Sequence, residues 1–151
     1  IRTAQADATQ HDWSFDLRGQ ADLVLADVPC SGLGLLGRKP EIRLTMTHDK
    51  IQALLPIQQQ ILDHAALLVK PGGHLVYSTC TINPQENIDQ VTHFLSAQQG
   101  IFIAEPLTGL LPHRLLEFPD LKTSAAAGWI QLLPQRHQTD GFFIARLRRI
   151  S

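Results

Sequence analysis

The sequence predicts an α/β fold in which strands and helices alternate and most strands lie parallel in a doubly wound sheet. Three observations indicate this class. Asp22–Ala26 is a short apolar run that is typical of a fully buried strand. Residues 51–69 place apolar side chains on one face at helical spacing. Lys70–Gly73 is typical of a helix stop and tight turn, and His74–Ser78 is a second strand candidate.

Other features of the first half fit around this strand–helix–strand unit. Arg2–Ala6 is a weak strand candidate. Residues 31–44 are expected to form a polar, glycine-rich loop between the first strand and the helix. Pro56 interrupts the helical pattern, which predicts either a kink or a fresh helix start at that position.

The second half continues the alternation. Asn83-Pro84-Gln85-Glu86 matches a helix opening, with Asn as the N-cap, Pro at the first helical position and Glu three residues after the cap. Gly100 is expected to end this helix, and Ile101–Ala104 is a third strand candidate. Residues 107–138 are expected to be irregular because several prolines interrupt them. Gly141–Leu147 is a final strand candidate.

Composition places the chain among ordinary globular domains. Its 151 residues carry a net charge of −1, with 44% hydrophobic and 18% charged residues. This balance gives no general basic field, so any nucleic-acid contact depends on local patches. No apolar run approaches the roughly 20 residues of a membrane helix. Two cysteines do not make a disulfide framework, and the histidines have no metal spacing, so we expect a cytoplasmic protein without membrane or metal.

The two cysteines each follow a strand candidate, where α/β sheets collect ligands and catalytic groups. Asp27 and Cys30 are separated by a turn that Pro29 makes rigid. Cys80 lies four residues before Pro84, close to a helix N-terminus, which lowers a thiol pKa. Taken singly, these residues also fit a strand-capping Asp and small buried cysteines. Their placement at two strand ends instead predicts that both thiols and Asp27 line one cleft.

Five segments together resemble the RNA cytosine-C5 methyltransferases, and they occur in that family's order. The resemblance covers residues 22–147 and is greatest to the bacterial methyltransferase B group, also called Sun or Fmu, which acts on small-subunit ribosomal RNA. The segments are Asp27-Val-Pro-Cys-Ser-Gly-Leu-Gly34, Arg38-Lys-Pro-Glu-Ile42, Ser78-Thr-Cys-Thr81, Pro84-Gln-Glu-Asn87 and Asp140-Gly-Phe-Phe-Ile-Ala145.

The resemblance implies a fold, a reaction and roles for three residues. The fold is the C-terminal part of a Rossmann-like, S-adenosylmethionine-dependent methyltransferase, mostly parallel with an antiparallel last strand. The reaction is methyl transfer to C5 of a cytosine in RNA through a covalent cysteine–C6 adduct. By resemblance, Cys80 attacks C6, Cys30 assists release of the product, and Asp27 hydrogen-bonds the polar edge of the base.

One departure concerns the cofactor. The family's glycine-rich loop, typically Ala-Pro-Gly-Gly-Lys, has no counterpart before Asp22. Residues 1–151 are therefore expected to be a partial catalytic domain, in which Asp7, Asp27 and Pro29 are the remaining cofactor contacts implied by the resemblance. We expect this chain alone to bind the cofactor weakly and to be inactive. The strand at Asp22–Ala26 would lose a neighbour and become an apolar edge, covered by Arg2–Ala6 or by a second chain in a dimer.

A small basic cluster, Arg38, Lys39 and Arg43, is the candidate RNA contact through phosphates, although a solvated loop explains it equally well. Two alternatives to an RNA methyltransferase stay open. One is a catalytically silent RNA-binding or interaction fragment of the same fold. The other is a methyltransferase acting on DNA cytosine or on protein, against which the Thr79-Cys80 signature argues.

Overall fold

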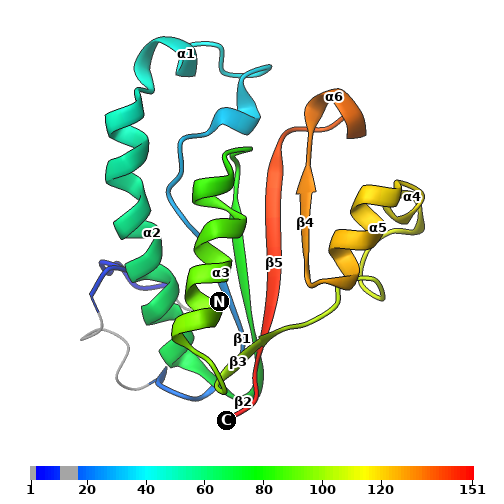
Figure 1. Ribbon diagram of the computed structural model, residues 1–151. Coiled ribbons are helices and arrows are strands. Elements are labelled where there is room, and N and C mark those ends of the chain that lie inside the picture. Colours follow the sequence, from blue (N-terminus) through cyan, green and yellow to red (C-terminus); the bar gives the residue numbers. More distant parts are fainter. Residues whose placement is uncertain (1–2, 11–16) are drawn as a thin grey trace.

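The computed structural model describes residues 3–10 and 17–151. Within these ranges a sheet of five strands carries helices on both faces (Figure 1). The strands are β1 Ala21–Asp27, β2 Val69–Thr79, β3 Phe102–Ala104, β4 Trp129–Leu132 and β5 Phe142–Arg149. The helices are α1 Ile42–Thr45, α2 His48–Leu68, α3 Ile88–Ala97, α4 His113–Leu116, α5 Pro119–Ala126 and α6 Pro134–His137, with 3₁₀ turns η2 Leu33–Leu35 and η3 Pro84–Glu86.

Strand direction confirms the α/β class and the antiparallel last strand. β1 pairs in parallel with β2, and β5 pairs antiparallel with β2. On its other side β5 pairs antiparallel with β3 near its end and with β4 near its start. Consequently β1, β2, β3 and β4 point the same way and β5 alone runs against them. The carboxyl ends of β1 and β2 therefore meet at one edge of the sheet.

Two apolar clusters hold the helices on the sheet, and the alternation of side chains along β5 separates them. On one face α2 and α3 cover β1, β2 and β5. The main buried members of that cluster are Leu62, Leu75, Tyr77, Phe94, Phe143 and Leu147. On the other face α5 packs against β4, with Leu121, Ala125 and Ile130 buried and Ile144 against them. Every helix in the described residues is too short or too polar to traverse a bilayer.

The strand expected at Arg2–Ala6 is wrong for residues 3–6, which have no regular secondary structure, and Arg2 lies outside the described residues. Shortly after this segment, the Ala8 carbonyl is 3.3 Å from Nδ1 of His64 on α2. Coverage of β1 by the segment stays a prediction.

Helix α2 runs without interruption from His48 to Leu68, so a fresh helix start at Pro56 is wrong. The helix begins earlier than its apolar pattern because the Thr47 hydroxyl accepts a hydrogen bond from the Lys50 amide and caps the first turn. After Leu68 the chain passes directly into β2, where Gly72 has a φ of 80° at an irregular point of the ladder. That backbone conformation suits glycine.

The expectation of irregular structure over 107–138 is wrong, because this region forms α4, α5, β4 and α6. Its prolines begin helices instead of breaking them. Pro112 is the N-cap of α4, while Pro119 and Pro134 are the first residues of α5 and α6. Proline is well suited to the first turn because the amide that it lacks would have no intrahelical partner there.

β1 is the edge strand that was expected, but its full burial is not found. Leu23 and Leu25 are 62% and 65% exposed on the sheet face opposite α2, whereas Ala26 is buried against the helices. Pairing of this edge with a second chain stays a prediction.

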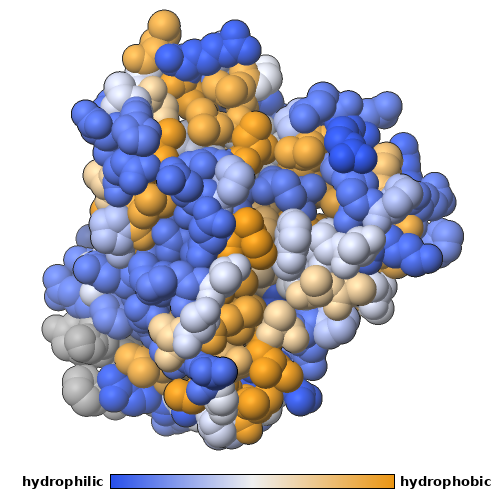
Figure 2. Space-filling view, viewed as in Figure 1, coloured by the Kyte–Doolittle hydropathy of each residue, from blue (hydrophilic) through white to orange (hydrophobic). Residues whose placement is uncertain are grey.

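A notch separates the α1 end of the molecule from α6, and apolar side chains gather on its α1 side (Figure 2). The segments that follow β1 and β2 meet in this part of the molecule (Figure 1). There Gly34 donates its amide to the Cys80 carbonyl at 3.0 Å, and Gly141 donates its amide to the Gly34 carbonyl at 2.8 Å. A Cβ on Gly34 would collide with the Gly141 carbonyl, so this close backbone crossing requires glycine.

Replacing Gly34 with Ala should therefore lower the free energy of unfolding by about 3 kcal/mol, because the crossing has no room for a methyl group. Gly37→Ala is the matched control, since a Cβ at Gly37 meets nothing within 4 Å, and it should change stability by less than about 0.5 kcal/mol. Urea denaturation of the two variants measures the difference. Equal midpoints would contradict this interpretation.

Candidate active site

The two cysteine thiols face one another at the ends of adjacent strands. Cys80 directly follows β2, and Cys30 lies three residues after β1. Their sulfur atoms are 3.2 Å apart, and both thiols are free and half-buried. The prediction that Cys30 and Cys80 come together at adjacent strand ends is confirmed, while a cleft that both thiols share with Asp27 stays a prediction.

The parallel ladder continues for one residue beyond β1 before the chain turns. Asp27 is aligned with Ser78, and the Val28 amide then donates to the Ser78 carbonyl at 3.2 Å. Pro29, which has no amide proton, ends this pairing. Gly32, with a φ of 70°, turns the chain into η2. The Cys30 segment is thus directed across the end of β2 instead of continuing along it.

A fully buried carboxylate, that of Glu86, joins the two cysteine segments. Its Oε1 accepts hydrogen bonds from the Ser31 amide at 2.8 Å and from Gln58 Nε2 at 3.0 Å. Its Oε2 accepts from the Ser31 hydroxyl at 2.6 Å. Because Ser31 is the neighbour of Cys30 and Gln58 lies on α2, these contacts fix the Cys30 segment to the helix.

The same carboxylate also receives donors from the Cys80 side. Thr81 Oγ1 and Asn83 Nδ2 donate to Glu86 Oε2 at 3.3 and 3.1 Å. The Tyr77 hydroxyl holds the same residue by its backbone, since it donates to the main-chain carbonyl of Glu86 at 2.7 Å. A buried charge with this many donors is well satisfied. Sequence reasoning assigned Glu86 to a helix cap and missed this role, although the Pro-x-Glu-Asn segment contained the signal.

A second hydrogen-bonded group connects the Cys80 segment with β4. Asn87 Nδ2 donates to the Thr81 carbonyl at 3.0 Å and to Gln131 Oε1 at 2.7 Å. Gln131 Nε2 donates to the same Thr81 carbonyl at 3.3 Å. Sequence reasoning also missed Gln131, since it lies in the region that was expected to be irregular.

The environment of Cys30 keeps its thiol protonated. Burial and, next in size, the hydrogen bond with Cys80 together raise the pKa of the Cys30 thiol to about 12. Two sulfurs at 3.2 Å cannot both carry a negative charge without strong repulsion. At neutral pH Cys30 is therefore a thiol that can donate its S–H proton toward Cys80.

Comparison with known proteins assigns the family. The family model for the 16S rRNA methyltransferase RsmB/F matches residues 1–148. The chain belongs to the RsmB/F methyltransferase family.

Individual relatives match this chain over part of their own length. The probable ribosomal RNA small subunit methyltransferase B of Synechocystis sp. is 44% identical over 128 residues, covering 85% of this chain and 27% of that protein. The protein of the same name in Bacillus subtilis is 41% identical over 152 residues, covering 99% of this chain and 32% of that protein. The chain therefore spans between about a quarter and a third of the length of these relatives.

Solved structures show the same fold. NSun6 from Pyrococcus horikoshii, solved with SFG, has a TM-score of 0.68 and 31% identity, covering 98% of this chain and 34% of that one. A methyltransferase homolog protein from the same organism has a TM-score of 0.64 and 29% identity, covering 91% and 41% of the two chains.

Three further residues of this RsmB/F family member are candidates for cofactor binding or catalysis, and all three are exposed: Asp7, Asp27 and Pro29. Asp27 accepts a hydrogen bond from the Ser78 hydroxyl at 2.8 Å, and the Pro29 carbonyl accepts from Gln58 Nε2 at 3.0 Å. Asp7 accepts from the Thr9 amide and hydroxyl at 2.9 and 2.7 Å, and these bonds lower its pKa. The structure thus brings Asp27 to the end of β1, while the roles of all three residues stay predictions.

The candidate RNA-contacting cations of the RsmB/F family member lie on the segment between β1 and α2. Lys39 and Arg43 are exposed, and Arg43 belongs to α1. Arg38 forms an ion pair with Asp140 at 3.0 Å. Arg38 therefore links its own motif to the Asp140-Gly141 motif as well as presenting charge to solvent.

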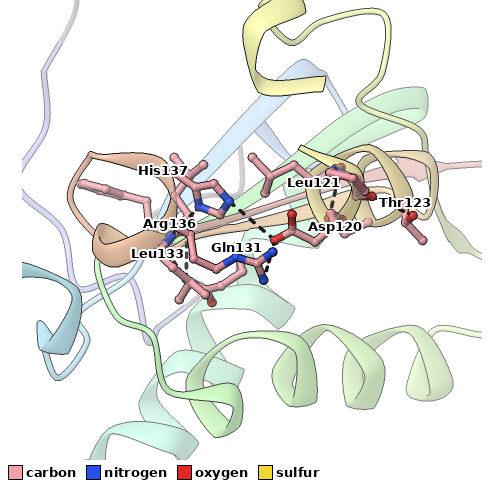
Figure 3. A network of polar contacts seen from close by, with 11 residues as sticks. Asp120, Leu121, Thr123, Gln131, Leu133, Arg136 and His137 are labelled. Atoms are coloured by element: carbon pink, nitrogen blue, oxygen red, sulfur yellow. Dashed lines mark hydrogen bonds and ion pairs between the residues drawn. The ribbon is translucent and has the colours of Figure 1, made fainter. Parts of the chain in front are cut away.

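A separate polar cluster joins α5 to α6 (Figure 3). Asp120 Oδ2 lies 3.2 Å from Arg136 NH1 and 3.5 Å from Nε2 of the buried His137. His137 Nδ1 accepts the Leu133 amide at 2.9 Å, so its proton resides on Nε2. Within residues 3–10 and 17–151, no group of His, Cys, Asp and Glu is arranged to hold a metal ion.

Glu86→Gln should reduce the free energy of unfolding by about 2–4 kcal/mol, because an uncharged amide replaces an acceptor that serves donors from three segments. Glu117→Gln, the same change at a mostly exposed side chain, should cost less than about 0.5 kcal/mol. Thermal and urea denaturation measure both. If the two variants were equally stable, the buried carboxylate would not organise this site.

Proposed function

We propose that the full-length protein transfers a methyl group from S-adenosylmethionine to C5 of a cytosine in small-subunit ribosomal RNA. The observation that carries this proposal is the pair of free thiols, 3.2 Å apart, in a member of the RsmB/F family. The names of the relatives support an RNA substrate from the small ribosomal subunit. A base in RNA reaches such a site when it is unpaired or flipped out of its stack.

The two thiols take different steps of the reaction. Carbon C5 of cytosine is a weak nucleophile until a sulfur adds to C6, and we assign that addition to Cys80. S-adenosylmethionine supplies the methyl group when it is bound. After transfer, water takes the proton from C5, the electrons of that C–H bond re-form the C5–C6 double bond, and the Cys80–C6 bond breaks. The Cys30 thiol, protonated because its pKa is raised, donates its S–H to the departing Cys80 sulfur and so assists release.

Asp27 and the basic cluster would position the RNA. The Ser78 hydroxyl holds Asp27 Oδ1, which leaves the exposed carboxylate oriented to accept hydrogen bonds from the polar edge of the base. Arg38, Lys39 and Arg43 lie on the segment that follows Cys30, and we assign them to phosphate contacts.

The cofactor contacts in this chain would be Asp7, Asp27 and Pro29. Their exposed carboxylates and backbone suit the N–H and O–H donors of S-adenosylmethionine. The NSun6 structure with SFG, an S-adenosylmethionine analogue, supports the same cofactor class. We propose that residues 1–151 are one part of the catalytic domain. On their own they would not catalyse the methyl transfer that the full-length protein performs.

Calorimetric titration of the 151-residue chain with S-adenosylmethionine should show weak binding or none, because the contacts named above make only part of a pocket. The full-length protein is the control and should bind. Micromolar binding by the 151-residue chain, on the order of −8 kcal/mol, would contradict the partial-domain proposal. Binding by neither protein would instead favour a catalytically silent RNA-binding role.

Single cysteine variants of the full-length protein should separate the two steps. Cys80→Ala should abolish the covalent adduct with substrate RNA, since addition to C6 needs its sulfur. Cys30→Ala should allow the adduct to form and persist, because the departing sulfur loses its proton donor. Denaturing gel electrophoresis with labelled RNA measures the adduct.

The double variant Cys30→Ala/Cys80→Ala is the control and should form no adduct. An adduct that persists in Cys80→Ala and is lost in Cys30→Ala would reverse the assignment of the two cysteines.

A further inference from the structure

The contact between Cys30 and Cys80 has a second chemical use. Their sulfurs are 3.2 Å apart, and a disulfide bond is about 2.05 Å long. An approach of roughly 1 Å therefore suffices for bond formation. We propose that Cys30 and Cys80 form an oxidation site at which a hydroperoxide produces an intramolecular disulfide that a thiol reductant reopens.

The backbone at both cysteines allows this approach. Cys30 lies in the segment between β1 and η2, and Cys80 lies between β2 and η3, so neither residue is inside a helix or a strand. Both residues are half-buried, so part of each stays open to a small oxidant. The sequence has these two cysteines and no others, so within the chain each thiol has one partner.

The hydrogen bonds of Glu86 favour a disulfide between Cys30 and Cys80 over further oxidation of a single thiol. The carboxylate binds Ser31, next to Cys30, and Thr81, next to Cys80. The Ser31 and Thr81 hydroxyls are themselves 2.8 Å apart. The residues that follow the two cysteines are therefore joined twice, through Glu86 and through their own hydroxyls. These hydrogen bonds keep the thiols facing one another when one of them is oxidised.

The oxidation proceeds in two balanced steps. The Cys80 thiol gives up its proton as its sulfur attacks one oxygen of hydrogen peroxide, the O–O bond breaks, and the departing hydroxide takes that proton to become water. The product is a sulfenic acid on Cys80. The Cys30 sulfur then attacks the Cys80 sulfur, the S–O bond breaks, and the departing hydroxide leaves as water with the Cys30 proton. Two thiols have lost two electrons, and the peroxide has accepted them.

Disulfide formation would also block the site, and this consequence rests on the proposed function. The Cys80 sulfur that adds to C6 would be held in a bond to Cys30. A small dithiol restores both thiols by exchange and becomes a disulfide itself, so the block is reversible. The bond also protects Cys80 from sulfinic acid, an oxidation state that thiols do not reverse.

The test treats the full-length protein with a molar excess of hydrogen peroxide and analyses non-reduced peptides by mass spectrometry. We expect one cross-linked pair of peptides containing Cys30 and Cys80, with the loss of two hydrogens, and its disappearance after dithiothreitol. Cys30→Ser is the matched control. It should give no cross-link and should convert Cys80 to sulfinic acid at least about tenfold faster than the wild type, because the resolving thiol is absent.

Two outcomes would overturn the proposal. One is that Cys80 of the wild-type protein becomes sulfinic acid without any cross-link. The other is that Cys80 becomes sulfinic acid at the same rate in the Cys30→Ser variant as in the wild type. These readouts do not depend on methyl transfer, so they stand if the proposed function fails. A cross-linked protein that still methylates RNA would overturn the proposed function of Cys80 and leave the oxidation site intact.

Discussion

The buried carboxylate of Glu86 is the interaction on which the arrangement of the site depends. A charge removed from water destabilises the fold unless hydrogen-bond donors surround it. Here the donors come from Ser31 after β1, from Thr81 and Asn83 after β2, and from Gln58 on α2. The requirement to satisfy one carboxylate therefore places three separate segments in a single arrangement. The distance between the two thiols follows from that arrangement.

The sheet topology determines the approximate positions of the two cysteines, and the hydrogen bonds of Glu86 determine them more closely. Because β1 and β2 are parallel neighbours, their carboxyl ends lie at the same edge, which brings Cys30 and Cys80 into the same region. The antiparallel β5 adds a third element at this edge, since the Gly141 amide before it binds the Gly34 carbonyl. The glycines matter here because only backbone without a side chain crosses at that separation.

The sequence predicts those features that depend on local patterns. The apolar runs gave β1 and β2, and the cysteines that follow them located the site. The role of Glu86 was not predictable in the same way, because a helix-capping pattern does not show that the side chain turns into the core toward Ser31. Pro119 and Pro134 were misread as breakers, since the same residue type serves at a helix start. Exposure of Leu25 depends on what covers a sheet face, which no local pattern shows.

The close thiol contact has two opposing consequences. Cys30 can act on the Cys80 sulfur only if it lies within reach of a proton transfer, and 3.2 Å meets that need. Burial raises the pKa of the Cys30 thiol to about 12, which keeps this thiol protonated at neutral pH. The same proximity places a second thiol beside the cysteine that we propose is oxidised first. The site that we propose adds and then releases a thiolate therefore contains, without any further residue, the two thiols that the proposed reversible disulfide needs.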